Sequence, residues 1–433
     1  MRDFARSDDT AVQSQLDRLG ALSVPEGRLG LETIRSLLGR LGNPQDRLPP
    51  VFHVAGTNGK GSTCAFLRAM LEADGKRVHT TISPHLVRYN ERIRIAGEMI
   101  SDARLAELLA QVLDAGENLS PSFFEVTIAA AFVEFARIPA DACVVEVGLG
   151  GRFDATNVVP HPAACGIATL GIDHERFLLA PEEGVPEAPL SRIAFEKAGI
   201  VKPGCSIVTL SYPPGPTLEI ERAAMAAGAP LAMRGAAWGA EVTELGLQYH
   251  DRDGALELPL PALPGRHQAE NAALAVAMLR HQDFASVSDS ALAQGIRSAK
   301  WPARLQRLRP GPLTGEREIW LDGGHNSDAG AMLSRHFSGR AIHLVIGMLA
   351  NKDPSALLNP LQSNLKSVST VPVPGHDHHR PSDFPSIRAI TTRGFDDVPA
   401  ALAALPDDGV PVLIAGSLYL AGRVLELNGE IPD

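Results

Sequence analysis

The chain has 433 residues, more than one ordinary hydrophobic core accommodates, so we expect two or three domains. Its net charge of −10 argues against a nucleic-acid partner, which would require a basic face. No apolar run approaches the roughly 20 residues of a membrane-spanning helix. The polar first residues, and four cysteines without a Cys-x-x-Cys pair, favour a cytoplasmic protein with no signal peptide and no membrane partner.

The first part of the chain alternates predicted strands and helices. Leucines at helical spacing predict two helices between residues 11 and 42. The continuous apolar run at 141–147 indicates a parallel strand buried on both faces. The alternation indicates a doubly wound α/β domain. Its further expected elements are strands at 51–54, 78–82, 165–170 and 204–210, and helices at 64–71, 102–114, 125–135, 193–197 and 267–279.

A second α/β pattern follows residue 300, and we place the domain boundary near 299–304, giving domains 1–300 and 301–433. Residues 178–190 are rich in Pro and Glu and predict a surface loop, whereas the weak signals of residues 215–262 give no order of elements. In the second unit we expect strands at 319–321, 343–346, 368–371, 388–391 and 412–414, alternating with helices at 327–337, 354–364, 397–404 and 417–428.

A glycine-rich loop follows the first strand and carries the strongest functional signal. Strand, glycine loop and helix together present backbone N–H groups and a helix N-terminus to a phosphate. Lys60 can reach the outer phosphates and Ser62 could hold a magnesium ion, although Gly61 separates the two, unlike in the usual P-loop. A tight strand-to-helix turn is the plainer alternative, but the lysine and the hydroxyl favour binding of a nucleoside triphosphate.

Polar residues also stand at the ends of other predicted strands. Ligands of an open parallel sheet collect beyond the carboxyl ends of its strands, where Ser83, Glu146, Asp173 and His174 are expected. Ser83 could be only a turn residue, and a lone histidine after a strand is more often a loop residue. Glu146 is harder to explain structurally, because a carboxylate in an apolar strand must be paired or bound to a cation. A magnesium site is the functional interpretation.

Other candidates have plausible structural interpretations. The run Gly148-Leu149-Gly150-Gly151 does not open a helix as a dinucleotide-binding fingerprint must, so we reject a dehydrogenase. Lys197 would by default be an exposed helix lysine, and Asn271 a capping residue. Asp322 and His325 follow the first strand of the second unit, where they indicate a site more than a cap.

Nine motifs occur together in chain order and resemble those of the folylpolyglutamate synthase/dihydrofolate synthase family of the Mur ligase superfamily. The resemblance covers about residues 30–425, and the joint occurrence is far more specific than any single motif. The motifs lie at 55–62, 83–86, 123–125, 150–157, 196–200, 267–272, 304–305, 322–326 and 416–419.

The resemblance implies a fold and an activity. Domain 1–300 would be a P-loop-type, doubly wound ATPase domain of the Mur ligase central type, and domain 301–433 a smaller Rossmann-like α/β domain. The enzyme would be an ATP-dependent amide-forming ligase of folate biosynthesis and one-carbon metabolism. It would join L-glutamate to dihydropteroate and extend reduced folates through an acyl phosphate, with ATP as co-substrate and Mg²⁺, two ions, as cofactor. The active site would lie between the domains of a monomer.

The resemblance also assigns roles to residues. Lys60, His174 and Lys197 would be catalytic, and Lys197 matches a lysine that is carbamylated in this family. Metal ligands would be Ser62, Ser83, Glu146 and His174. ATP would be bound by Gly56, Thr57, Asn58, Gly59, Lys60, Gly61, Ser62, Asn271, Arg304, Asp322 and His325. The pterin end of the substrate would contact Phe123, Phe124, Arg152, Asp154 and Ala155.

Two departures and three alternatives accompany this interpretation. Segment 179–190 is longer than is usual for the family, and Gly324 replaces the usual alanine. The enzyme could have only one of the two ligase activities. A Mur-type ligase acting on a UDP-linked peptide is disfavoured by the motifs at 83–86 and 123–125. A P-loop ATPase or regulator without ligase activity would not need the residues Glu146, His174 and Lys197.

Overall fold

The computed structural model describes residues 6–22, 30–385, 387, 390 and 392–432. The chain forms two compact units, each of which we describe by itself. None of the helices within these ranges is long and apolar enough to cross a bilayer. Unit 1 comprises Met1–Pro84, Arg88–Ala262 and Arg266–Lys300, and unit 2 comprises His85–Val87, Leu263–Gly265 and Trp301–Asp433.

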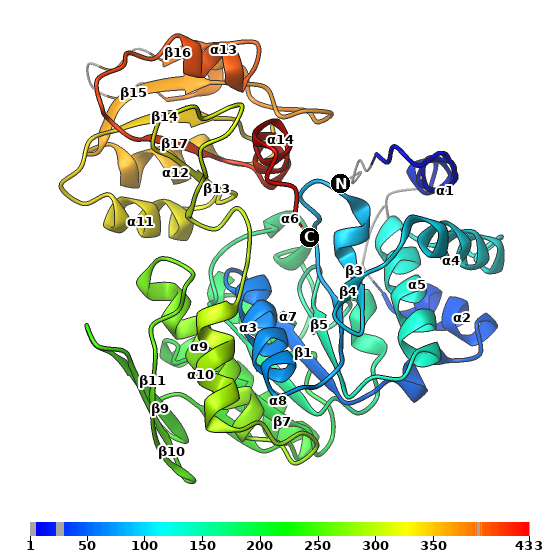
Figure 1. Ribbon diagram of the computed structural model, residues 1–433. Coiled ribbons are helices and arrows are strands. Elements are labelled where there is room, and N and C mark those ends of the chain that lie inside the picture. The colour runs from blue at the N-terminus through cyan, green and yellow to red at the C-terminus, as the bar shows by residue number, and fades with distance from the viewer. Residues whose placement is uncertain (1–5, 23–29, 386, 388–389, 391, 433) are drawn as a thin grey trace. The chain divides into compact units, whose positions relative to one another are not determined.

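Unit 1 is built on an eight-stranded sheet of order β4-β3-β2-β5-β1-β6-β7-β8 (Figure 1). From β2 to β8 neighbouring strands are parallel, and β3 and β4 extend the sheet in antiparallel fashion at one edge. The strands are β1 (Val51–Ala55), β2 (Val78–Thr81), β3 (Ile93–Ile95), β4 (Glu98–Met99), β5 (Ala142–Glu146), β6 (Ala164–Ile167), β7 (Ser206–Thr209) and β8 (Leu231–Met233).

Helices cover both faces of this sheet, as the alternation of side chains along β6 shows. Cys165 and Ile167 pack among residues of α7 and α8, whereas a Cβ added to Gly166 would meet Met278 of α9. Near-continuous apolar strands follow from this two-sided burial. The helices are α1 (Thr10–Gly20), α2 (Glu32–Arg40), α3 (Lys60–Ala73), α4 (Asp102–Ala115), α5 (Phe123–Arg137), α6 (Glu175–Leu178), α7 (Pro189–Ala198), α8 (Pro214–Ala227), α9 (Arg266–Arg280) and α10 (Asp289–Ser298).

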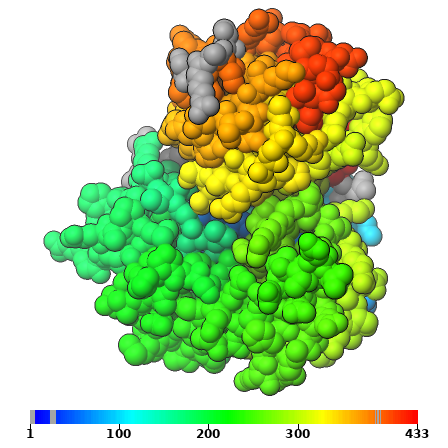
Figure 2. Space-filling view, turned by 90° about the vertical axis from the view of Figure 1, so that its left-hand side faces the viewer, coloured from blue at the N-terminus to red at the C-terminus, as the bar shows by residue number. Residues whose placement is uncertain are grey.

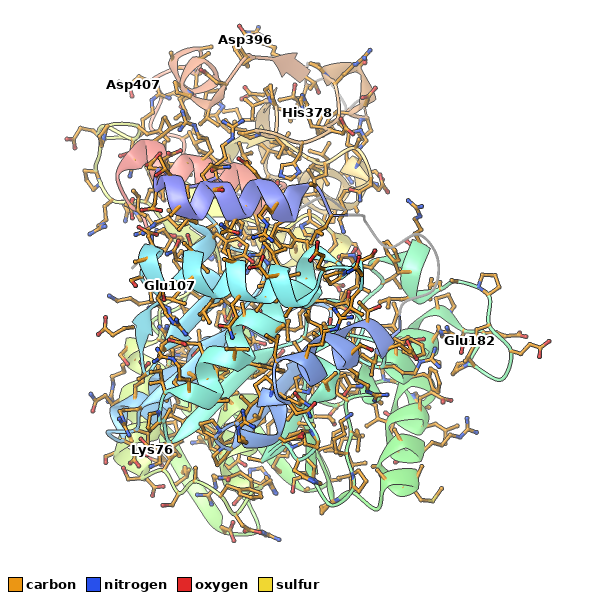
Figure 3. The ribbon with its side chains drawn as sticks, turned by 90° about the vertical axis from the view of Figure 1, so that its right-hand side faces the viewer. Lys76, Glu107, Glu182, His378, Asp396 and Asp407 are labelled. Carbon is orange, nitrogen blue, oxygen red and sulfur yellow. The ribbon has the colours of Figure 1, made fainter. Side chains whose placement is uncertain are left out.

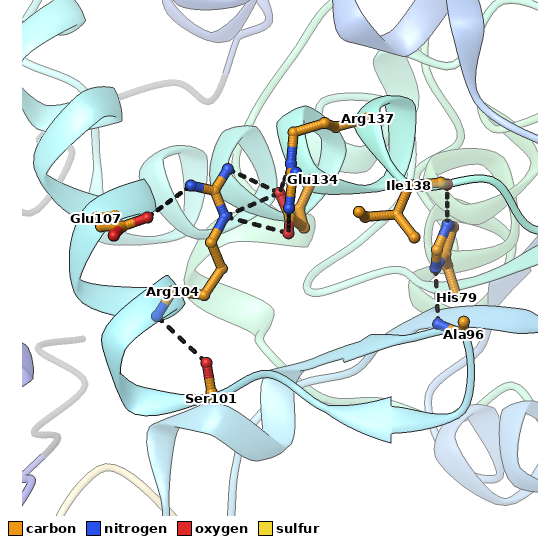
Figure 4. Close-up of polar contacts among 8 residues, drawn as sticks. All are labelled: His79, Ala96, Ser101, Arg104, Glu107, Glu134, Arg137 and Ile138. Atoms are coloured by element: carbon orange, nitrogen blue, oxygen red, sulfur yellow. Dashed lines mark hydrogen bonds and ion pairs between the residues drawn. The ribbon is translucent and has the colours of Figure 1, made fainter.

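Local chemistry fixes where the helices α4 and α5 begin and how they meet. Ser101 caps α4, and Ser122 forms a capping box with Glu125 at the start of α5. Glu134 of α5, which is almost fully buried, accepts hydrogen bonds from Arg104 of α4 and from Arg137 (Figure 4). The apolar faces of α1, α2, α4 and α5 share one core cluster.

Two parts of unit 1 were not ordered by the sequence. Residues 215–262 include α8 and a three-stranded antiparallel sheet, β9 (Trp238–Val242), β10 (Leu247–Asp251) and β11 (Gly254–Leu258). Trp238 stacks on Tyr249 across this small sheet. Helix α10 was not predicted either. It approaches α3 closely, since a Cβ added to Gly295 would lie 2.5 Å from the backbone of Met70.

Unit 2 has a six-stranded sheet of order β12-β13-β17-β14-β15-β16, in which only the pair β12–β13 is antiparallel. Two core clusters cover its two faces. The expected strand 388–391 includes residues 388, 389 and 391, which lie outside the described part of the chain. The elements are β12 (Gln306–Arg307), β13 (Ile319–Asp322), β14 (Ile342–Ile346), β15 (Leu365–Thr370), β16 (Thr392–Gly394), β17 (Val412–Ala415), α11 (Ser327–His336), α12 (Pro354–Leu361), α13 (Val398–Ala403) and α14 (Leu418–Asn428).

Candidate active site

The carboxyl ends of four neighbouring strands of unit 1 carry the residues that the sequence singles out. Strands β2, β5, β1 and β6 are adjacent in the sheet and parallel, so the loops that follow them leave from the same edge. The glycine loop follows β1, Ser83 follows β2, Glu146 ends β5, and Asp173 with His174 follow β6. Strand order reverses around β1, the position at which open α/β sheets bind ligands.

The glycine loop is fixed to the segment after β6 by hydrogen bonds. The backbone N–H of Thr57 donates to the carbonyl of Thr169 at 2.8 Å, and its hydroxyl donates to the carbonyl of Gly171 at 2.8 Å. Lys60 opens α3, and its Nζ donates to the carbonyl of Gly56 at 3.1 Å. The loop therefore presents a lysine and the first turn of a helix at one place, which suits an anion.

Gly59 brings the loop and α9 into contact. Its φ of +84° lies in the left-handed region that favours glycine. A Cβ at this position would lie 2.4 Å from Oδ1 of Asn271. Asn271 is buried, and its Nδ2 donates to Oε1 of Gln268 at 3.1 Å. The structure thus brings Asn271, a predicted ATP contact, directly against the glycine loop.

Glu146 and Ser83 lie together, as an oxygen-rich site would require. The backbone N–H of Ser83 donates to Oε2 of Glu146 at 3.2 Å, and only 5% of Glu146 is exposed. The charges of both Glu146 and Lys60 affect the pKa of the buried Cys64 thiol in α3. Burial raises this pKa most, the negative charge of Glu146 raises it further, and the positive charge of Lys60 lowers it. Glu146 therefore faces α3, the helix that begins with Lys60 and Ser62.

The default expectation for Lys197, an exposed helix lysine, is wrong. Only 4% of Lys197 is exposed, although it lies in the last turn of the short amphipathic helix α7. Burial, and after it the positive charge of Lys60, lower the pKa of Lys197 to about 7, although the negative charge of Asp173 opposes the shift. Its amine is therefore near the balance between charged and neutral forms at neutral pH, beside the glycine loop's lysine.

His174 occupies a special backbone position at the start of α6. Its φ of +53° is left-handed, and its backbone N–H donates to Oδ1 of Asp173 at 2.7 Å. Its ring is about one-third exposed, with Nε2 4.0 Å from Oδ2 of Asp173. The imidazole can therefore be reached by a ligand at the carboxyl edge.

Most of the residues expected at the pterin end belong to the loop after β5 or pack against it. The ring of Phe124 packs on Gly148, where a Cβ would lie 2.4 Å from Cζ. Burial raises the pKa of Asp154, whose carboxylate accepts the backbone N–H groups of Leu149 and Thr156. Ala155 is buried beside it, and Phe123 meets Tyr89 edge to face. Asp154 thus shapes this loop from within.

Arg152 is held in an ion-pair network that the sequence did not reveal. Its guanidinium donates to Glu182 and to Glu196, with the shortest contacts at 2.6 and 2.8 Å, and the same two glutamates pair with Arg192. The rings of Phe153 and Phe195 lie at 4.3 and 4.8 Å from its Cζ. Glu182 belongs to the mostly exposed segment 179–188, which Figures 2 and 3 show at the surface of unit 1. A glutamate in a loop gives no sequence signal for such a role.

In unit 2, three predicted ATP contacts lie around the end of β13. Asp322 is buried, and it accepts the backbone N–H groups of Leu305 and Gly324, each at 2.7 Å. Burial raises its pKa. A Cβ at Gly323 would lie 2.9 Å from Nη1 of Arg304, and Nδ1 of His325 lies 3.2 Å from the carbonyl oxygen of Gly323. Arg304, Asp322 and His325 are therefore brought together.

The donor set suits magnesium better than a softer metal. Among the described residues, no group of three or more His, Cys, Asp or Glu side chains could hold a metal by itself. Magnesium is usually bound by one or two carboxylates, with water and substrate phosphates completing its shell. Glu146 with the hydroxyls of Ser62 and Ser83 fits that pattern, because all supply oxygen.

Comparison with known proteins identifies the family. No family model matches the chain. The sequence is 34% identical over 428 residues to the dihydrofolate synthase/folylpolyglutamate synthase of Bacillus subtilis (strain 168), covering 91% of this chain and 94% of that protein. The chain belongs to the folylpolyglutamate synthase/dihydrofolate synthase family. The resemblance expected from the nine motifs is thereby confirmed.

Solved structures of this family share the fold. Escherichia coli FolC in complex with DHPP and ADP has a TM-score of 0.85 at 33% identity, covering 96% of this chain and 97% of that chain. A bifunctional folylpolyglutamate synthase/dihydrofolate synthase with Mn, AMPPNP and L-glutamate bound has a TM-score of 0.82 at 31% identity, with coverage of 96% and 97%. The expected α/β class, with a P-loop-type doubly wound domain and a smaller Rossmann-like domain, is confirmed.

Proposed function

We propose that the carboxyl edge of the eight-stranded sheet is where this enzyme activates a pterin carboxylate with ATP. The protein is an ATP-dependent amide-forming ligase, which adds L-glutamate to dihydropteroate and to reduced folates through an acyl phosphate. One observation supports the site most strongly: Lys197 is buried beside Lys60 with its pKa lowered to about 7. A cation that is difficult to keep charged in such surroundings needs a functional reason.

Charge neutralisation explains what the glycine loop contributes. The carboxylate of the substrate and the γ-phosphate are both anions, so they repel each other as they approach. Lys60 and the backbone N–H groups at the start of α3 would stabilise the γ-phosphate while the carboxylate attacks it. The amine of L-glutamate then attacks the acyl carbon, a tetrahedral intermediate forms, and phosphate leaves.

Lys197 would act as a carbamate. Its neutral amine, populated because burial lowers its pKa, adds to carbon dioxide and loses a proton, which leaves a carbamate anion. This change replaces a buried cation near Lys60 by an anion, so repulsion becomes attraction. His174, at the same edge, would complete the catalytic set.

The metal and the nucleotide complete the proposal. A divalent cation would neutralise phosphate charge, and we propose magnesium, two ions in number, with Ser62, Ser83, Glu146 and His174 as ligands. ATP would contact residues 56–62 and Asn271 in domain 1–300, which we assign as the Mur ligase central type. Arg304, Asp322 and His325 would supply contacts from domain 301–433. The pterin would meet Phe123, Phe124, Arg152, Asp154 and Ala155, and we propose that the enzyme acts as a monomer.

A side-by-side assay tests the activity. The purified chain with ATP, magnesium and L-glutamate should release phosphate when dihydropteroate is added and when tetrahydrofolate is added. Mass spectrometry should find each product one glutamate heavier. If neither acceptor caused phosphate release, the ligase assignment would be overturned. If only one of them did, the enzyme would be restricted to a single activity.

A further inference from the structure

Two cysteines outside the proposed site lie close enough to react with each other. Cys165 is in β6, and Cys205 immediately precedes the neighbouring parallel strand β7. Their Sγ atoms are 3.7 Å apart. Both are free thiols in the apolar cluster between the sheet and the helices α7 and α8. A disulfide requires an S–S distance of about 2.05 Å, so a small side-chain movement would join them.

The two thiols differ in reactivity. The hydrogen bond between the two thiols lowers the pKa of Cys205, and the positive charge of Lys202 lowers it further, although burial opposes the shift. The pKa of Cys165 is raised by the same hydrogen bond and by its complete burial. Because the thiolate is the nucleophile, Cys205 would react first and Cys165 would resolve the product.

We propose that Cys165 and Cys205 form an oxidisable dithiol that a peroxide converts into a disulfide within unit 1. The Cys205 thiolate attacks one peroxide oxygen, the O–O bond breaks, and after one proton is taken up a sulfenic acid and water result. The Cys165 thiol then displaces hydroxide from the sulfenic sulfur, which forms the S–S bond and releases a second water. The dithiol loses two electrons, and hydrogen peroxide is reduced to water.

This oxidation would remove a hydrogen bond from the turn that follows Lys197. The Cys165 thiol now donates to the carbonyl of Ile200 at 3.3 Å, and a disulfide has no hydrogen to donate. In the same turn, Nζ of Lys202 donates to the carbonyl and side-chain oxygens of Asn157, at 3.2 and 2.7 Å. Asn157 in turn donates to the carbonyls of Gly199 and Arg152. The hydrogen bond from Cys165 to Ile200 therefore connects the dithiol to the turn that joins α7 to the loop after β5.

Peptide mapping tests the disulfide without reference to activity. The full-length protein is treated with hydrogen peroxide, denatured, alkylated and digested. We expect a Cys165–Cys205 cross-linked peptide, the loss of two hydrogen masses, and complete reversal by dithiothreitol. Cys143→Ser is the matched control, because this buried β-strand thiol lies outside the pair, and it should leave the cross-link intact. If both Cys165 and Cys205 of the wild-type protein could still be alkylated after peroxide treatment, the proposal would be overturned.

The effect on turnover depends on the proposed function, and the phosphate-release assay measures it separately. The oxidised wild type should be slowed about fivefold, the factor that corresponds to one lost hydrogen bond, and dithiothreitol should restore it. Cys205→Ala should be insensitive to peroxide. Unchanged turnover of a fully cross-linked enzyme would refute the coupling to the turn. An enzyme that is inactive even when reduced would contradict the proposed function and leave the mapping result intact.

Discussion

Replacing Gly59 by alanine separates backbone strain from a clash at the nucleotide loop. Alanine at a φ of +84° costs about 1–2 kcal/mol. The new Cβ would also lie 2.4 Å from Oδ1 of Asn271, closer than real Cβ contacts, so Asn271 or the loop must move. We expect Gly59→Ala to lose stability by about the strain term and to bind ATP at least tenfold more weakly, a change of about 1.4 kcal/mol in binding.

Gly75 provides a matched control on the other end of α3. It has a φ of +78°, and a Cβ there would meet nothing within 4 Å. Gly75→Ala should therefore show the same strain in urea denaturation and unchanged ATP affinity in calorimetry. Adding Asn271→Ala to Gly59→Ala removes the clashing atom, so the two substitutions should be less than additive. ATP affinity of Gly59→Ala equal to that of Gly75→Ala would refute the arrangement of loop and α9.

Three further predictions concern Glu182, His53 and Glu146. Glu182→Gln should destabilise unit 1 by about 1–3 kcal/mol, because it weakens two charge-assisted contacts of Arg152. Glu183 is exposed on the same segment, so Glu183→Gln should change the stability measured in urea by less than about 0.5 kcal/mol. Equal effects of the two substitutions would exclude the network. Burial lowers the pKa of His53 from 6.5 to about 3, so between these pH values the unfolded chain binds a proton that the folded chain does not, and the free energy of unfolding should fall by up to about 4–5 kcal/mol as the pH drops from about 6.5 to about 3. In His53→Gln, denaturation measured over this pH range should lack that decrease. The same dependence of stability on pH in the variant and the wild type would contradict the assignment. Glu146→Gln should raise the magnesium concentration needed for half-maximal phosphate release, and an identical magnesium titration would leave Glu146 a structural role only.

The sequence predicted those features that depend on local pattern. The apolar run at 141–147 indicated a strand buried on both faces, and β5 lies in the middle of the sheet. The glycine loop and Glu146 stood out because glycines at a strand-to-helix turn and a carboxylate in an apolar strand each require a physical explanation. Side-by-side placement of β2, β5, β1 and β6 then follows from the α/β topology.

Other features depend on contacts between distant segments and left no local signal. Lys197 lies in a helix with ordinary amphipathic spacing, and its burial follows from the contact of the end of α7 with the loop after β5, where a Cβ at Gly151 would lie 2.9 Å from the carbonyl oxygen of Lys197. Glu182 gains its role only because the segment before α7 returns to Arg152. Strands β9 to β11 are short and rich in small or polar residues, so their pairing, rather than their composition, defines them.

Oxygen-isotope transfer tests the central claim most directly. Dihydropteroate labelled with oxygen-18 in its carboxylate is incubated with the enzyme, ATP, magnesium and L-glutamate, and the released phosphate is analysed by mass spectrometry. If the carboxylate is activated as an acyl phosphate, one labelled oxygen must leave with each phosphate that accompanies product. Product formation with unlabelled phosphate would contradict this route, and with it the role given to the glycine loop, Glu146 and Lys197.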